Sequence, residues 1–136
     1  MITRSADLGR LMVVRLNPGD DLLRSLTEVV RENGIRSGVI LNGIGSLSHY
    51  HVHVVKTTQL PPGDVFFEGE GPFDILNVTG FILDGRVHAH IAFSNTEKAM
   101  GGHLEEGCRV LTFSVLTLAE VAEVSLAGWD RVGPLG

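Results

Sequence analysis

The chain has 136 residues, of which 43% are hydrophobic and 20% are charged, and this balance is typical of a single globular domain. Eleven Lys and Arg residues against 16 Asp and Glu residues give a net charge of −5. This charge argues against DNA binding by the bare domain, because contacts to a phosphate backbone need a dense basic surface. The single cysteine, Cys108, excludes an intrachain disulfide, and the absence of a secretory signal or an uninterrupted apolar span predicts a cytoplasmic protein without membrane contact.

The first half of the chain predicts a strand, a helix and a bent strand. An apolar run in "GRLMVVRLNPGDD" indicates a strand that ends at a Pro-Gly turn, after which Asp20 or Asp21 caps a helix. Apolar residues at helical spacing predict that helix, and Asn33-Gly34 ends it. Residues 37–55 predict a strand, a glycine-marked bend that needs positive φ at Gly43 or Gly45, and a second strand. The apolar positions of the helix are Leu22, Leu26, Val29 and Val30.

The second half predicts a hairpin, a loop and closing strands. Residues 57–64 indicate a loop, and residues 74–94 contain two alternating runs around Asp84-Gly85, a pair that suits a type I′ turn. Residues 96–107 predict a loop with at most a short helical turn, residues 108–126 one or two strands, and residues 128–136 a loose tail. Together these elements predict one α+β domain over residues 1–136, with one helix among many antiparallel strands.

A two-residue turn at Asp84-Gly85 fixes which side chains share a face of the hairpin. His88 and His90 then lie on a mixed face, and the opposite face is almost purely apolar and packs on the core. The predicted pairs are Leu83 with Arg86, Phe81 with His88, Thr79 with His90, and Asn77 with Ala92. The predicted core face holds Val87, Ala89, Ile91 and Phe93 with Leu76, Val78, Gly80 and Ile82.

Two imidazoles on one strand face can bind one metal ion, because residues two apart lie about 6.5–7 Å from each other. His88 and His90 have this spacing, and His103 follows in a glycine-rich segment that we expect to fold back as a flexible third ligand. Three histidines with an open fourth position are typical of a zinc site that holds water or a ligand. The alternative is that His-x-His is polar decoration of a strand.

Other polar residues give weaker hypotheses. Glu105 or Glu106 is a candidate general base or a group that orients an imidazole, and Thr79 and Asn77 are candidates to support the metal ligands. His49, His51 and His53 alternate along one strand face, which favours a polar surface or a subunit contact, although one of them could reach the trio.

Five segments together resemble the plants-and-prokaryotes-conserved (PPC) domain family. They are "LNPGDDLLRSL", "GIRSGVILNGIGSLS", "FDILNVTGFI", "GRVHAHIAFSN" and "GGHLEEGCRV", in the order of the family and over residues 10–118. The resemblance implies paired sheets with flanking helices, a homotrimer, and a zinc site at His88, His90 and His103. The family's DNA-binding description depends largely on an AT-hook beside the domain in plant members, and this sequence contains no such Arg-Gly-Arg-Pro segment.

Two classes of function follow from these observations. The first is a trimeric zinc-binding regulatory module that recognises a protein or a small molecule, and the sequence favours it. The second is a zinc-dependent enzyme acting on a small carbonyl or hydroxy-acid substrate, by fold-level similarity to acetolactate decarboxylase. The lack of an evident acid or base other than Glu105 and Glu106 argues against the enzyme.

Overall fold

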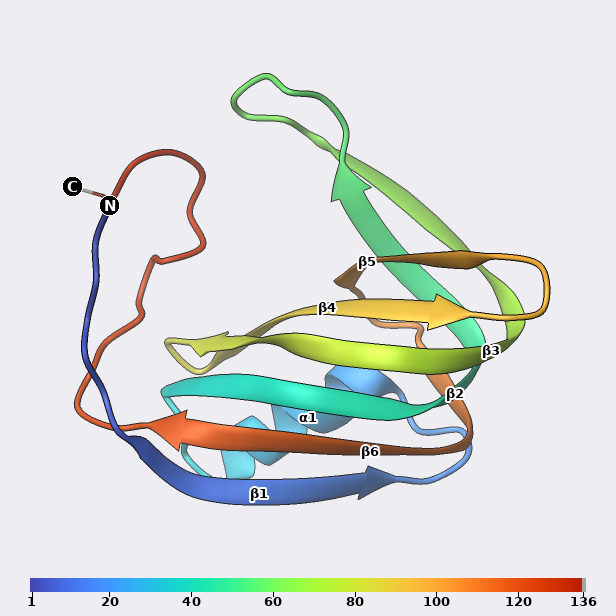
Figure 1. Ribbon diagram of the computed structural model, residues 1–136, viewed down its shortest axis with the longest axis horizontal. Coiled ribbons are helices and arrows are strands. Elements are labelled where there is room, and N and C mark those ends of the chain that lie inside the picture. Colours follow the sequence, from blue (N-terminus) through green and yellow to red (C-terminus); the bar gives the residue numbers. More distant parts are fainter. Residues whose placement is uncertain (136) are drawn as a thin grey trace.

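The computed structural model describes residues 1–135. It contains one helix and one antiparallel sheet whose strands differ in length (Figure 1). The six strands lie in the order β1-β6-β2-β3-β4-β5, and α1 lies against one face of the sheet. This architecture confirms the predicted α+β class. The elements are β1 (Leu8–Leu16), α1 (Leu22–Glu32), β2 (Ser37–Val55), β3 (Asp64–Leu83), β4 (Arg86–Ser94), β5 (Ala99–Leu104) and β6 (Arg109–Val121).

The sheet curls so that its last strand meets an interior strand. The first half of β2 pairs with β6, and near its end β2 pairs with β5 through Val52 opposite Leu104 and His53 opposite His103. Strands β2, β3, β4 and β5 therefore form a closed circuit of hydrogen-bonded neighbours. Beyond this circuit the end of β2 and the start of β3 continue as a projecting two-stranded arm, seen at the top of Figure 1.

The predicted helix forms at the predicted position. Asp21 is its N-cap, because its carboxylate accepts a hydrogen bond from the backbone N–H of Arg24, and Asn33 is its C-cap. Leu22, Leu26 and Val30 are buried. No helix within residues 1–135 is long and apolar enough to cross a membrane.

The predicted register of the β3–β4 hairpin is confirmed at every pair. Asp84 and Gly85 adopt φ angles of 53° and 78°, as a type I′ turn requires. The prediction that Leu76 faces the core is wrong. A β-bulge between Ile75 and Asn77 turns the Leu76 side chain outward, where it is 53% exposed, and Ile75 is buried in its place. The confirmed pairs are Leu83 with Arg86, Phe81 with His88, Thr79 with His90, and Asn77 with Ala92.

The prediction of a loop over residues 96–107 is wrong for its middle part, because Ala99–Leu104 form strand β5. β5 pairs with β4 on one side and with the end of β2 on the other. Gly101 and Gly102 weaken any strand pattern in the sequence, yet they suit this position. A Cβ at Gly101 would lie 2.2 Å from the carbonyl oxygen of Ile91, and one at Gly102 would lie 2.7 Å from that of His53. The glycines therefore allow β5 to approach both neighbouring strands closely.

Two other predicted segments also differ in detail. Residues 37–55 form one continuous strand, with bulges and with a φ of 145° at Gly45, where we predicted two strands separated by a bend. Residues 122–135 contain no helix or strand, although Asp130 makes contacts described below. Gly136, the end of the predicted loose tail, lies outside the described residues.

Candidate metal centre

Strand pairing brings three predicted ligands together. His88 and His90 lie two apart on β4, and His103 on β5 stands directly opposite His90. Each of the three offers a ring nitrogen, and these atoms all lie within 4.8 Å of one another. The ring centroid of His103 is 4.6 Å from that of His88 and 5.6 Å from that of His90. The sheet register therefore positions His103, and no flexible loop is required.

The donor set fits a transition-metal ion. Imidazole binds a metal only when it is neutral. Partial desolvation by the surrounding protein, followed by the neighbouring charge of His88, lowers the pKa of His90 and lowers the pKa of His103 to about 4. Both rings are consequently unprotonated at neutral pH. Three imidazole nitrogens that bind one zinc ion would leave a fourth position for water or a ligand.

The C-terminal segment contributes a carboxylate that the sequence did not reveal. Asp130 Oδ2 accepts a hydrogen bond from Nδ1 of His88 at 2.9 Å, and both Asp130 oxygens accept from the Arg86 guanidinium at 3.0 and 3.1 Å. These hydrogen bonds, the one from Arg86 first, lower the pKa of Asp130 to about 2. The carboxylate is thus ionised at neutral pH, and it lies 42 residues from His88 in a segment without a recognisable pattern.

A fourth imidazole, that of His53 on β2, stacks on His103 with ring centroids 4.3 Å apart. Its Nδ1 lies 2.6 Å from Glu105 Oε1, and its Nε2 lies 3.6 Å from Asp64 Oδ1. His53, His103 and Glu105 also form a cluster with ligand atoms within 4.8 Å. A separation of 2.6 Å is that of a charge-assisted hydrogen bond, and two ligands of one ion stand farther apart. In this arrangement Glu105 and His53 form a hydrogen-bonded pair beside the trio.

The remaining candidates lie elsewhere. Thr79 donates to the carbonyl of Ile40 at 3.2 Å, and Asn77 accepts from the N–H of Gly43 at 3.4 Å. Both side chains therefore join β3 to β2, and within residues 1–135 neither has a hydrogen bond to an imidazole. His49 is not part of either histidine cluster among the described residues.

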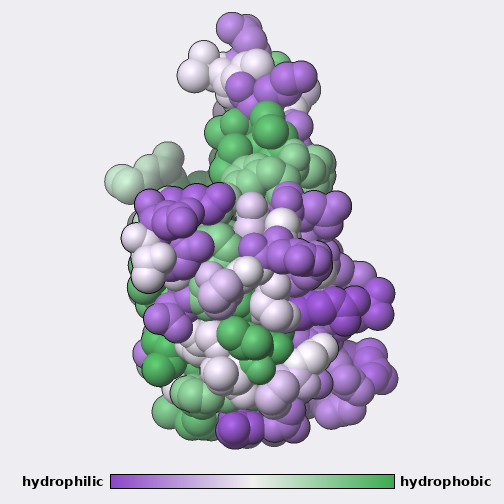
Figure 2. Space-filling model, turned by 90° about the vertical axis from the view of Figure 1, so that its right-hand side faces the viewer, coloured by the Kyte–Doolittle hydropathy of each residue, from purple (hydrophilic) through white to green (hydrophobic). Residues whose placement is uncertain are grey.

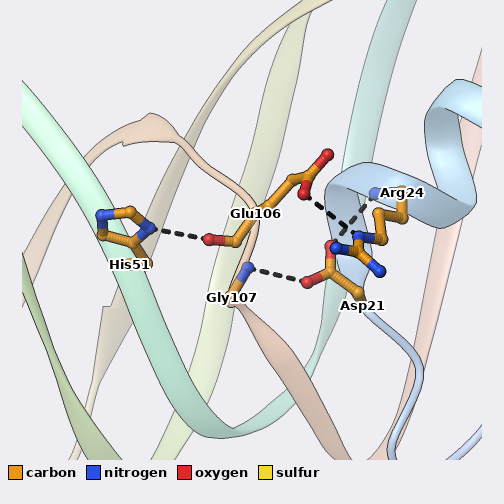
Figure 3. A network of polar contacts seen from close by, with 5 residues as sticks. All are labelled: Asp21, Arg24, His51, Glu106 and Gly107. Atoms are coloured by element: carbon orange, nitrogen blue, oxygen red, sulfur yellow. Dashed lines mark hydrogen bonds and ion pairs between the residues drawn. The ribbon is translucent and has the colours of Figure 1, made fainter.

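The turn after β5 is anchored to the start of α1 by the contacts drawn in Figure 3. Asp21 accepts a hydrogen bond from the N–H of Gly107 at 2.7 Å, and Arg24 contacts Glu106 at 3.1 Å. From the other side, Nδ1 of His51 donates to the Glu106 carbonyl at 2.7 Å. Glu106 and His51 thus hold the turn that carries Glu105, and their side chains do not join the trio.

Cys108 gives a prediction that is independent of any metal. Burial raises the pKa of its thiol to about 11, and the side chain is fully buried. Because the thiolate is the reactive form, we expect the native protein to react with a thiol reagent such as DTNB only after denaturation. Stoichiometric labelling within minutes at pH 8 in the folded state would contradict this account of Cys108.

Comparison with known proteins places these residues in a family. Residues 3–122 match the family model of the Plants and Prokaryotes Conserved (PCC) domain. The bifunctional protein GlmU of Synechococcus sp. (strain JA-3-3Ab) is 30% identical over 115 residues, which cover 84% of this chain and 18% of the relative. The chain thus spans less than a fifth of the curated relatives that it matches.

Solved structures have the same fold. A plant- and prokaryote-conserved (PPC) protein of Pyrococcus horikoshii has a TM-score of 0.79 and 26% identity, with 98% of this chain and 100% of that chain covered. A metal-containing protein of Archaeoglobus fulgidus has a TM-score of 0.76 and 24% identity, with 93% and 88% covered.

More distant structures include the acetolactate decarboxylase of Bacillus subtilis subspecies spizizenii, with a TM-score of 0.57, 12% identity, and 85% and 53% of the chains covered. This likeness extends to the fold alone. The family model, in contrast, spans nearly the whole chain and contains all the histidines described above. The chain belongs to the Plants and Prokaryotes Conserved domain family, as its motifs predict.

Proposed function

We propose that this protein is a zinc-binding, homotrimeric recognition module. The observation that carries the proposal is the convergence of three imidazoles, His88, His90 and His103, from two paired strands. Neutral imidazoles suit zinc, copper, iron and nickel, and zinc accepts three histidines with an exchangeable fourth ligand. The description of the Archaeoglobus fulgidus neighbour as metal-containing agrees with this proposal. Measurement of the metal content, described in the Discussion, tests it.

The exposed apolar surface supports the trimer. On the face of the sheet opposite α1, residues of four strands expose large apolar side chains, which we call the open face. Monomers rarely expose such extended apolar patches, because their burial against another chain is favourable. A symmetric homotrimer would cover the same patch on every copy. The open face comprises Leu11 and Val13 on β1, Leu111 and Phe113 on β6, Ile44 on β2, and Leu76 on β3, which are between 38% and 67% exposed.

The projecting arm extends this apolar surface. Val54 and Val55 at the end of β2, with Val65 and Phe66 at the start of β3, are between 39% and 67% exposed. Figure 2 shows a hydrophobic band below the polar tip of the arm. Such an arm suits contact with a neighbouring copy, and the fourth metal position suits a small molecule or a partner that offers an oxygen, nitrogen or sulfur ligand.

We expect the protein not to bind duplex DNA with useful affinity. A protein of Ralstonia eutropha with a TM-score of 0.67 and 25% identity, over 82% of this chain and 77% of that chain, is described as a proposed DNA-binding protein. The present sequence has a net charge of −5 and contains no AT-hook. Titration of labelled duplex DNA at physiological salt should give no binding at protein concentrations below about 100 μM, which is the weakest dissociation constant in the ordinary range for non-specific DNA binding. Submicromolar, salt-sensitive binding would contradict this expectation.

A zinc-dependent enzyme is the second candidate. The hydrogen-bonded pair of His53 and Glu105 stands beside the trio and could position a substrate bound at the fourth metal position. A lyase or isomerase acting on small keto or hydroxy acids would fit this arrangement. Turnover of such an acid that disappears with EDTA and returns with zinc would favour the enzyme. Ligand binding that requires zinc but yields no product would favour the recognition module.

A further inference from the structure

The C-terminal segment places one carboxylate against the metal site. Asp130 follows β6 by nine residues and lies outside every strand, yet its side chain is only 15% exposed. Its Oδ2 atom lies 2.9 Å from Nδ1 of His88, and the same oxygen lies 3.0 Å from the Arg86 guanidinium. Oδ1 accepts the second hydrogen bond from Arg86, so the pair is bidentate.

This geometry determines which nitrogen of His88 is available. The carboxylate accepts hydrogen bonds only, so Nδ1 must carry the hydrogen. The lone pair is then on Nε2, the nitrogen on the other side of the ring. A ligand imidazole whose second N–H is held by a carboxylate is fixed in tautomer and orientation, and the carboxylate also makes it a stronger donor.

Arg86 fixes the carboxylate in turn. Arg86 and His88 lie two apart on β4, so their side chains share the outer face of the hairpin. The bidentate contact sets the plane of the carboxylate and leaves Oδ2 directed at the imidazole. Asp130 is not part of either cluster of possible metal ligands in residues 1–135, which indicates a role through His88 and not direct coordination.

We propose that Asp130 is a positioning residue of the metal site, which holds His88 as the Nδ1–H tautomer and directs Nε2 at the ion. This inference rests on the proposed metal binding at His88, His90 and His103. It makes the segment after β6 a functional part of the domain. Two substitutions at Asp130 and a matched control elsewhere on the same hairpin test it.

The variants are Asp130→Ala and Asp130→Asn, with Asp84→Asn as the control. Asp84 also pairs with an arginine, Arg36, but it lies at the hairpin turn and has no hydrogen bond to a histidine among residues 1–135. The control therefore loses the same charge and one ion pair. Zinc affinity of the full chain is measured by competition with a chromophoric chelator. We expect affinity to fall about 10- to 100-fold in Asp130→Ala, the range found for outer partners of ligand histidines.

The tautomer of His88 is measured separately, in metal-free protein, by long-range ¹H–¹⁵N NMR of the imidazole nitrogens. We expect the Nδ1–H form in the wild type and in Asp84→Asn, and a mixture of tautomers in Asp130→Ala. Asp130→Asn keeps an acceptor oxygen without the charge and should fall between the wild type and Asp130→Ala in both readouts. Circular dichroism checks that all variants are folded.

Each outcome bears on the inference. Zinc affinity of Asp130→Ala within twofold of the wild type would overturn it, and so would an Nε2–H tautomer of His88 in the wild type. Weaker binding with an unchanged tautomer would also overturn it, because charge alone would then explain the loss. A wild type that binds no zinc would defeat the proposed function. The NMR result would still decide whether Asp130 orients His88, so the two failures are distinguishable.

Discussion

Replacement of His90 by alanine should weaken zinc binding about a hundredfold while the domain stays folded. The binding free energy of a structural zinc ion is roughly 10–16 kcal/mol, shared among four ligands. Loss of one ligand therefore costs about 3 kcal/mol, or roughly a hundredfold in affinity. His90 is exposed, and its neighbours Ala89 and Ile91 point into the core on the opposite face. The substitution therefore removes a ligand and leaves the packing of the β3–β4 hairpin intact.

The matched control for this experiment is His49→Ala. His49 lies on β2 and belongs to neither histidine cluster in the described part of the chain. Its replacement should leave zinc stoichiometry unchanged, and His88→Ala and His103→Ala should behave like His90→Ala. Full zinc occupancy in all three variants of the trio would show that these histidines are a polar surface without a metal.

Introduction of a charge on the open face should convert the trimer into monomers. Ile44 is 54% exposed on β2 and lies at the middle of this apolar surface. In a trimer that covers the face, Ile44→Glu would bury an unpaired carboxylate at a cost of several kcal/mol per copy. Multi-angle light scattering should then give the mass of three chains for the wild type and the mass of one chain for the variant.

A control substitution on the opposite side of the molecule separates this effect from general changes in charge. Thr27 lies on the exposed side of α1, so Thr27→Glu adds the same charge without touching the open face. This variant should remain trimeric. A wild type that is monomeric at micromolar concentration would refute the proposed assembly directly, and a trimeric Ile44→Glu would show that another surface holds it.

Local patterns in the sequence predicted the parts of the site that depend on nearby residues. The turn at Asp84-Gly85 sets the register of the β3–β4 hairpin, and with it the shared face of His88 and His90. Asp21 and the apolar spacing of α1 predicted the helix in the same way. In both cases the determining residues lie within one turn or one hairpin, so no knowledge of distant contacts is needed.

The contacts that complete the site connect distant segments, and local patterns do not contain them. β5 looks like a loop because of Gly101 and Gly102, and only the closeness of β4 and β2 explains those glycines. The curl of the sheet brings His53 against His103, although the two residues are 50 positions apart in the sequence. Asp130 belongs to a segment whose composition suggests no structure, and its partner on β4 becomes evident only in three dimensions.

The measurement that tests this account most directly is the zinc content of the wild-type protein. The chain is purified without a polyhistidine tag or a chelator, supplemented with zinc, dialysed, and analysed by mass spectrometry of the elements. The account predicts close to one zinc ion per chain, which is lost in His90→Ala and retained in His49→Ala. A content far below one ion per chain in the wild type would contradict it.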